Sequence, residues 1–413
     1  MKTLPHPRPL TTKLIAATLF TATAGLIVWL PQPGATAGAE PPVPLSATQG
    51  PPVLSPNERP VVEAVFVLDT TGSMGGLIQA AKDKIWSIAS TMAAAEPAPQ
   101  LRMGLVAYRD RGDAYVTRVV DLSPDLDALH AELFQLQASG GGDGPEAVNQ
   151  ALDDAVNSIS WGREPGAYRV VFLVGDAEPH MDYQDDVKYP QTLKLARKRG
   201  IRVNAIQCGN APGTRGHWQQ VAQLGGGAYF RVDQDGAAVA IATPYDDELA
   251  ELAARLDDTR LYYGSAEERA DRARHLAKSS AALEAAPAPV KARRATFAAS
   301  DTGKAALFGE RELVGEVASG RVKLQSVAPE SLPGPLQGLS RAEQQRVIDQ
   351  IAEERARLRA RIEATAAKRS AYLHEEVAAR GGAENSLDQK LYDAVREQGG
   401  ALGLHYSGDA PAY

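Results

Sequence analysis

A nearly unbroken apolar run rich in β-branched residues, at positions 61–68, stops abruptly at a polar, glycine-rich turn, at 69–76. Runs of this kind form strands that are covered on both faces in a parallel sheet. Apolar residues then recur at helical spacing over 77–92, which predicts an amphipathic helix that ends before Pro97 and Pro99. A strand, a polar turn and a helix form the first βα unit of an α/β fold.

The same pattern recurs along the first 245 residues. Five further apolar runs predict strands, at 101–108, 115–122, 168–174, 201–208 and 228–232. Helical windows are at 125–137, 145–159, 189–199 and 217–223. The gap between the second and third strands is too short for a crossover connection, so those two strands should pair antiparallel. The sequence therefore predicts an α/β fold with a doubly wound, six-stranded, mostly parallel Rossmann-like sheet.

The chain changes character after about Tyr245. Charged helical segments without strand alternation follow at 246–257 and 266–285, and then Pro287 and Pro289 interrupt the pattern. A long helix is predicted from 340 to 379, with one narrow apolar stripe. Such a helix can pack on neighbours within the chain or form an oligomerising coiled coil, although a sustained heptad is missing. We therefore divide the chain into a sheet domain, 61–245, which we expect to fold without the rest, and a helical C-terminal region, 246–413.

The first sixty residues are predicted to lie outside the fold. A basic head, an uncharged apolar run at 14–30 and small residues up to Ala39 are typical of a secretory signal peptide, here 1–39. The run is long enough that an uncleaved membrane anchor is the alternative. A proline-rich linker follows at 40–60. We therefore expect an exported protein, periplasmic or extracellular, that contacts a membrane only if the N-terminal segment stays uncleaved.

Composition excludes several classes of protein. The 413 residues carry 44 basic and 51 acidic side chains, a net charge of −7. Since this leaves no positive surplus for phosphate backbones, we expect no nucleic-acid partner. The single cysteine, Cys208, excludes an intrachain disulfide and a cysteine-built zinc site, and its place in an apolar strand predicts a small buried residue.

Oxygen-bearing side chains gather where the predicted strands end. Asp69, Thr71 and Ser73 follow the first strand, Asp143 lies in a glycine-rich loop, and Asp176 follows the fourth strand. Ligands of open α/β sheets bind at the carboxyl ends of the strands, so these loops should meet. Hard oxygen ligands without clustered His or Cys suit Mg²⁺. The alternative for the first three residues is a helix N-cap cluster.

Two further motifs have competing interpretations. His180 and Asp182 follow Asp176 closely and could extend the metal site, although a polar surface loop is the favoured interpretation. Arg111, Gly112 and Asp113 spell a tripeptide that some integrins recognise. A three-residue match in a predicted hairpin turn is weak, so a structural turn is favoured there too.

The Asp-x-Thr-x-Ser turn after an apolar strand, the glycine-rich second loop and the later Asp176 resemble the metal-ion-dependent adhesion site of von Willebrand factor type A domains, above all bacterial extracellular members. The resemblance covers about residues 61–233. It implies Mg²⁺, Mn²⁺ or Ca²⁺ bound by Asp69, Thr71, Ser73 and Asp176, and an exported adhesion or scaffold module. The partner would be an unidentified protein or cell-surface ligand. Asp143 departs from the Thr of adhesive members and should weaken attraction for an acidic partner group.

The first loop also resembles that of haloacid-dehalogenase-type phosphotransferases, in which Asp69 would be a nucleophile. That chemistry needs a lysine beside the phosphoryl group and a late pair of acidic residues. Position 70 is Thr, no lysine occurs between Lys84 and Lys188, and His180 stands where the second acid would fall. We therefore expect a binding module and no enzyme, with a magnesium-dependent phosphotransferase or phosphatase as the alternative.

Overall fold

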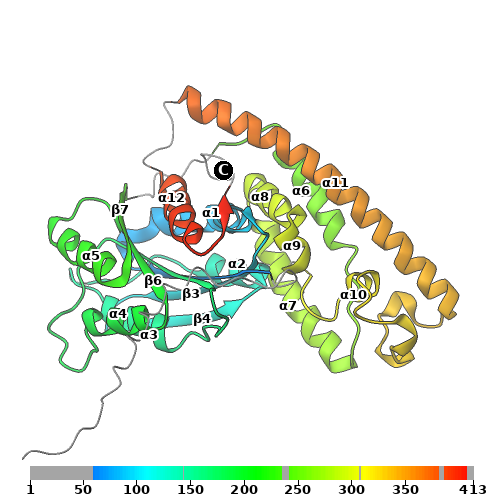
Figure 1. Ribbon diagram of the computed structural model, residues 1–413, viewed down its shortest axis with the longest axis horizontal. Coiled ribbons are helices and arrows are strands. Elements are labelled where there is room, and N and C mark those ends of the chain that lie inside the picture. Colours follow the sequence, from blue (N-terminus) through cyan, green and yellow to red (C-terminus); the bar gives the residue numbers. More distant parts are fainter. Residues whose placement is uncertain (1–58, 143, 235–240, 307, 381–385, 407–413) are drawn as a thin grey trace, which may run out of the picture. The chain divides into compact units, whose positions relative to one another are not determined.

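The computed structural model describes residues 59–142, 144–234, 241–306, 308–380 and 386–406. The predicted signal peptide and nearly all of the linker lie outside the described residues. Six strands form one sheet in the order β4-β3-β1-β5-β6-β7 (Figure 1). Their bounds are β1 Val61–Asp69, β3 Gln100–Tyr108, β4 Thr117–Ser123, β5 Tyr168–Gly175, β6 Ile201–Cys208 and β7 Gly226–Val232. The pairing of β3 with β4 is antiparallel and the other pairings in this sheet are parallel, which confirms the predicted fold class.

The strand order reverses at β1, which lies between β3 and β5. Asp69 at the end of β1 is in register with Tyr108 at the end of β3. Leu68 is in register with Val174, near the end of β5. Because ligands of doubly wound sheets bind in the crevice where the order reverses, the loops after these three strands are the place to look for a site.

Helices cover both faces of the sheet (Figure 1). On β1 the side chains alternate, so Val65 and Val67 face one hydrophobic cluster and Ala64 and Leu68 face the other. The first cluster takes in α3 Val148–Asn157, α4 Tyr189–Lys198 and α5 Pro212–Gly225, and the second takes in α1 Gly75–Ala93 and α2 Leu126–Gln135.

Short and long helices make up the C-terminal region, as predicted. They are α6 Asp246–Asp257, α7 Ala266–Ala285, α8 Ala288–Ala299, α9 Asp301–Ala306, α10 Leu313–Ala318, α11 Arg341–Ala379 and α12 Leu387–Gly400. Pro287 is the N-cap of α8 and Pro289 lies in its first turn, where a missing N–H costs nothing. The two prolines that interrupt the preceding helical pattern therefore also begin the next helix. A two-residue strand pair, β2 Ala95–Glu96 with β8 His405–Tyr406, joins the region to the end of α1.

One hydrophobic cluster contains residues from both sides of Tyr245. Phe297 on α8 and Leu391 and Val395 on α12 belong to the same cluster as Trp86 and Met92 on α1. Two buried polar contacts accompany them, since Lys84 pairs with Asp388 at 2.9 Å and Tyr168 donates to Gln398 at 2.9 Å. The boundary at Tyr245 stays a prediction about chain organisation, but the core of the sheet domain continues across it.

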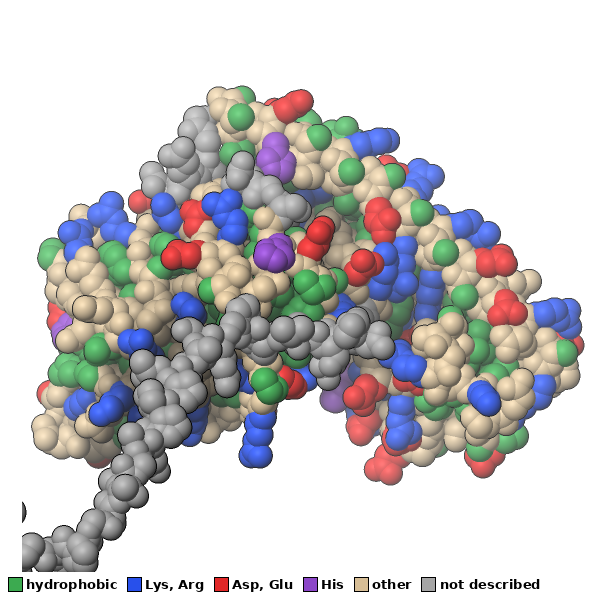
Figure 2. Space-filling model, viewed as in Figure 1, with side chains coloured by type: hydrophobic (Ala, Val, Ile, Leu, Met, Phe, Trp, Pro, Cys, Tyr) green, Lys and Arg blue, Asp and Glu red, His purple; other side chains and the backbone are tan. Residues whose placement is uncertain are grey.

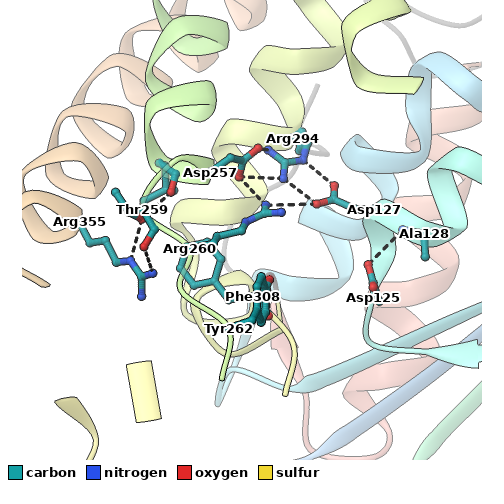
Figure 3. Close-up of polar contacts among 11 residues, drawn as sticks. Asp125, Asp127, Ala128, Asp257, Thr259, Arg260, Tyr262, Arg294, Phe308 and Arg355 are labelled. Atoms are coloured by element: carbon teal, nitrogen blue, oxygen red, sulfur yellow. Dashed lines mark hydrogen bonds and ion pairs between the residues drawn. The ribbon is translucent and has the colours of Figure 1, made fainter. Parts of the chain in front are cut away.

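Buried charges join α2, α6 and α8. The guanidinium of Arg294 lies between the carboxylates of Asp127 and Asp257, and Arg260 contacts the same two carboxylates (Figure 3). Arg294 and Asp127 are buried, and the Asp257 side chain is 26% exposed. The two arginines and two aspartates balance in charge, which lowers the cost of burying Arg294 and Asp127. The network thus fixes the helical region to a helix of the sheet domain.

The long helix α11 uses its apolar stripe within the chain. Leu358 and Ile362 pack in a cluster with residues of α6 and α8, and Arg355 forms a buried pair with Glu312 at 2.7 Å. Figure 2 shows basic and acidic side chains interspersed along this helix. These contacts agree with the predicted packing of the helix on neighbours within the chain. Among the residues that the structure describes, no helix combines the length and apolar character needed to cross a membrane.

Candidate metal site

The first loop is shaped by Asp69. Its Oδ1 accepts hydrogen bonds from the backbone N of Thr71 at 2.9 Å and from the Thr71 hydroxyl at 2.7 Å. The hydroxyls of Thr71 and Ser73 lie 3.4 Å apart. The short 3-10 helix Gly72–Met74 and α1 both begin without a side-chain cap, so these residues turn the chain and do not act as the helix N-cap that the sequence left open.

The other carboxylate oxygen of Asp69 has no hydrogen-bond donor. The residue is fully buried, and its Oδ2 accepts no hydrogen bond of ordinary geometry. Burial raises the pKa of Asp69 to about 7, against hydrogen bonds from Thr71 that lower it, and the nearby carboxylate of Asp176 raises it further. A buried oxygen without a partner costs free energy, and a cation placed against it would remove that cost.

Asp176 follows β5 and faces the first loop. Its backbone carbonyl accepts from the Thr214 hydroxyl at 2.9 Å, and its Oδ2 accepts from the Gln234 amide at 2.6 Å. The same Gln234 amide lies 3.3 Å from the carbonyl of Ser73. Gln234 therefore links the first and third loops. Gln234 was not among the residues predicted from the sequence, although its position just beyond the last strand, at the same edge of the sheet, was a usable signal.

The carboxyl ends of the strands enclose one pocket. It is lined by oxygen side chains, by glycines of the second loop and by their neighbours: Thr71, Gly72, Ser73, Gly141, Gly144, Pro145, Glu146, Asp176, Ala177, Glu178, Ala211 and Thr214. Three of the predicted ligands, Thr71, Ser73 and Asp176, thus share a pocket. Asp143 lies outside the described residues, but Gly141 and Gly144 on either side of it line the same pocket. Glu146, which is 3% exposed, is a carboxylate that sequence reasoning missed.

Backbone hydrogen bonds hold the three loops together. Gly72 donates to Gly140 at 3.1 Å, which joins the first loop to the second. Glu146 donates to the carbonyl of Glu178 at 2.8 Å and accepts from His180 at 3.1 Å, which joins the second loop to the third. A site built on these loops is therefore preorganised by the main chain.

Gly175 leaves space beside the buried carboxylate. A Cβ atom at this position would lie 2.4 Å from the Tyr108 hydroxyl and 3.0 Å from Asp69. Such contacts are too close for any other residue, so glycine here permits close approach of β5 to Asp69. Burial raises the pKa of Tyr108, which keeps its phenol neutral and able to donate a hydrogen bond.

The described donors fit a hard cation better than a soft one. Asp69, Thr71, Ser73 and Asp176 offer only oxygen atoms, the ligands that Mg²⁺, Mn²⁺ and Ca²⁺ prefer. No group of three or more His, Cys, Asp or Glu side chains suited to a metal occurs in the described part of the chain. A complete ligand set would thus depend on the two hydroxyls, on water and on the undescribed Asp143.

His180 and Asp182 lie in a separate polar cluster. His180 Nε2 is 3.2 Å from Asp110 and its Nδ1 is 2.8 Å from Asp182. The imidazole stacks on Tyr183 at 3.9 Å, and the Tyr183 hydroxyl donates to Asp110 at 2.9 Å. Neither His180 nor Asp182 is among the residues that line the pocket. This placement favours the polar loop over an extension of the metal site, and it shows a role for Asp110 that the sequence did not indicate.

The charged groups of the Arg-Gly-Asp turn make contacts with other residues of the chain. Arg111 pairs with Asp185 at 2.9 Å and with Asp186, and it lies 4.2 Å over the ring of Tyr183. Asp113 accepts from the backbone N of Gly141 at 3.0 Å. These contacts agree with the structural interpretation of the tripeptide. Cys208 is buried as expected, and burial raises the pKa of its thiol.

Strand order and the oxygen-lined crevice define a doubly wound α/β domain with a candidate cation site at its switch point. Residues 63–239 match the family model of the von Willebrand factor A domain, and this part of the chain is a von Willebrand factor A domain.

Two curated relatives match shorter segments. An ariadne-like RING finger protein of Acanthamoeba polyphaga mimivirus is 27% identical over 124 residues, which are 30% of this chain and 12% of that protein. An alpha-protein kinase of Dictyostelium discoideum is 28% identical over 121 residues, which are 29% of this chain and 19% of that protein. The chain thus spans less than a fifth of the length of either relative.

Solved structures resemble the chain more distantly. Proximal thread matrix protein 1 from the mussel byssus, with a zinc-occupied MIDAS motif, is 18% identical with a TM-score of 0.34, and the match covers 43% of each chain. An aerotolerance-related membrane protein from Bacteroides fragilis is 17% identical with a TM-score of 0.31, over 43% of this chain and 94% of that one.

Proposed function

We propose that the chain is a non-enzymatic, metal-dependent protein-binding module of the adhesion or scaffold kind. The observation that carries the proposal is the buried Oδ2 of Asp69, which has no hydrogen-bond partner and lies at the strand-order reversal. A carboxylate in this position costs free energy unless a cation or a proton compensates it. A divalent cation is the compensation that the surrounding oxygen donors favour.

Each loop would contribute differently to the cation. Asp69 supplies the most deeply buried charge, and Thr71 and Ser73 supply neutral hydroxyls that add ligands without adding charge. Asp176 would supply a second carboxylate, with its orientation held by Gln234 and Thr214. Asp143 would supply a third, directly or through water. The pocket above these residues is open to a partner, which would complete the coordination of Mg²⁺, Mn²⁺ or Ca²⁺.

Export forms the second half of the proposal. The basic head, apolar run and small residues of positions 1–39 support a secretory signal, so the module would act in the periplasm or outside the cell. Its partner would then be a protein or a cell-surface ligand. A membrane would be involved only if the N-terminal segment stayed uncleaved.

Calorimetric titration with Mg²⁺ tests the site. The wild-type chain should bind Mg²⁺ and melt at a higher temperature in its presence, because a ligand of the native state alone stabilises that state. Asp69→Asn keeps the shape of the side chain and should abolish both effects. Asp153→Asn on α3 removes the same charge at a half-buried position that does not line the pocket, and it should change neither. Equal binding by wild type and Asp69→Asn would refute the site.

A further inference from the structure

The turn between β3 and β4 contacts all three loops of the candidate site, although none of its residues lines the pocket. Arg109 is buried, and its guanidinium donates to the carbonyl of Thr70 in the first loop at 3.2 Å and to the carbonyl of Gln137, just before the second loop, at 2.8 Å. Asp110 accepts a hydrogen bond at 2.9 Å from the hydroxyl of Tyr183 in the third loop, which follows β5. One short segment therefore connects loops that are far apart in the sequence.

Asp113 at the end of this turn holds the second loop. Its Oδ2 accepts hydrogen bonds from the backbone N of Gly141 at 3.0 Å and from the backbone N of Asp110 at 3.2 Å. Gly140 has a φ of 81°, and a Cβ atom there would lie 2.3 Å from Oδ1 of Asp113. Glycine at this position therefore permits the close approach of the second loop to the carboxylate.

The two glycines that Asp113 contacts lie in turn against the first loop. The carbonyl of Gly140 accepts a hydrogen bond from the backbone N of Gly72 at 3.1 Å. A Cβ atom at Gly141, where φ is 70°, would lie 2.9 Å from the Cβ atom of Thr71. Because Thr71 is a candidate ligand of the cation, Asp113 is connected to the ligand set through the main chain of the second loop.

We propose that Asp113 is a positioning residue of the metal site, which keeps the second loop against Thr71 and so holds the first loop in the shape that binds the cation. This inference rests on the proposed metal-dependent function. Groups that hold ligands in place before the cation arrives raise its affinity, because the loops need not be ordered on binding. Asp113 does not line the pocket, so its effect passes through Gly140 and Gly141. The Arg-Gly-Asp turn thus acquires a role inside this chain.

Calorimetric titration of the full chain with Mg²⁺ tests this role. Asp113→Ala removes the acceptor and should weaken Mg²⁺ binding by roughly threefold to tenfold, at or below the usual effect of a residue that orients a metal ligand. Asp113→Asn keeps one acceptor oxygen for the two N–H groups and loses only the charge, so it should bind Mg²⁺ within about twofold of wild type.

Asp121→Ala is the matched control. Oδ1 of Asp121 also accepts from two backbone N atoms, those of Leu122 and Ser160, both at 2.8 Å, and the residue does not line the pocket. This variant should leave Mg²⁺ affinity unchanged. Hydrogen exchange at the backbone N–H of Gly72 gives a second measurement: it should be faster in Asp113→Ala, because its acceptor on Gly140 is no longer held, and as in wild type in Asp121→Ala.

The outcomes separate the two proposals. If wild type binds no Mg²⁺, the metal-dependent function fails, and the positioning role fails with it. If wild type and Asp113→Ala bind Mg²⁺ equally, or if exchange at Gly72 is the same in both, the positioning role alone is overturned. Equal losses of affinity in Asp113→Asn and Asp113→Ala would also overturn it, because they would show that Asp113 acts through its charge. An equal loss in Asp121→Ala would show a general effect of stability and would overturn it too.

Discussion

Arg294 on α8 donates two hydrogen bonds, at 2.5 and 2.6 Å, to the carboxylate of Asp127 on α2, although 167 positions separate them in the chain. Both side chains are buried, and Asp257 and Arg260 complete the network. The neighbouring guanidinium groups hold the pKa of Asp127 below its usual value despite burial. The pair therefore joins the helical region to the sheet domain through charges that neither part could bury alone.

Removing one member of this pair should destabilise the whole chain. Asp127→Ala leaves the buried guanidinium of Arg294 and the partly buried one of Arg260 with one carboxylate, and it should cost about 3 to 5 kcal/mol in the free energy of unfolding. Urea denaturation measures this change in the free energy of unfolding. Glu354→Ala, which breaks pairs with Arg255 on α6 and Arg357 on α11 that solvent reaches, should cost less than about 1 kcal/mol. Equal losses in the two variants would show that the buried network adds no stability.

His130 should make stability depend on pH. It is 1% exposed beside Trp86, and burial lowers its pKa to about 4, against the nearby Asp127 that raises it. Between about pH 6.5 and 4 the unfolded chain binds a proton that the native state refuses, so stability should fall as pH falls through this window. The free energy of unfolding should fall by about 2 to 3 kcal/mol over this window. Urea midpoints at pH 7 and 4.5 should differ less in His130→Leu than in wild type, and an identical difference would contradict the assignment.

Removing α12 should expose the core of the sheet domain. A chain that ends at Arg380 loses Leu391 and Val395 from the cluster and leaves Lys84 without Asp388. It should melt at a lower temperature and bind a hydrophobic dye, because the face of α1 is uncovered. A chain that ends at Tyr406 retains α12 and should behave as wild type. For the same reason we expect residues 61–245 alone to fold poorly, contrary to the expectation from the sequence. Cooperative melting of that fragment would instead support an independent sheet domain that ends at Tyr245.

Asp143→Thr tests the second loop. If the carboxylate contributes to the cation, the substitution should lower Mg²⁺ affinity and raise binding of acidic peptides, because the loaded site becomes more positive. Calorimetry measures the first effect and peptide titration the second. Asp153→Thr on α3 is the matched control. Unchanged Mg²⁺ affinity would show that Asp143 faces away from the pocket.

The purified chain should not hydrolyse small phosphate esters in the presence of Mg²⁺. The pocket residues include no lysine or arginine to balance a phosphoryl group, although the first loop resembles that of phosphotransferases. A colorimetric assay with a generic phosphoester checks this expectation. Sustained hydrolysis that disappears in Asp69→Asn would replace the binding module with the enzyme.

Local patterns were enough to predict the sheet. Each strand is a short apolar run with its own turn signals, and the short connection before Thr117 left antiparallel pairing as the way to join β3 and β4. The oxygen residues of the candidate site could also be predicted, because strand ends in a doubly wound sheet meet at one edge. Asp69, Thr71, Ser73 and Asp176 could therefore be named from their positions alone.

Contacts between distant segments required the folded chain. Nothing around Arg294 or Asp388 in sequence indicates Asp127 or Lys84 as a partner, since pairing over such separations is set by how helices dock. The same holds for Gln234 against Asp176, for His180 against Asp110, and for the unpartnered oxygen of Asp69. Period and spacing determine which face of an element is apolar, whereas burial and charge compensation depend on what covers that face. The strands and the oxygen-rich loops were thus encoded locally, and the shared core, the buried ion pairs and the acidity of the pocket arose from tertiary contacts.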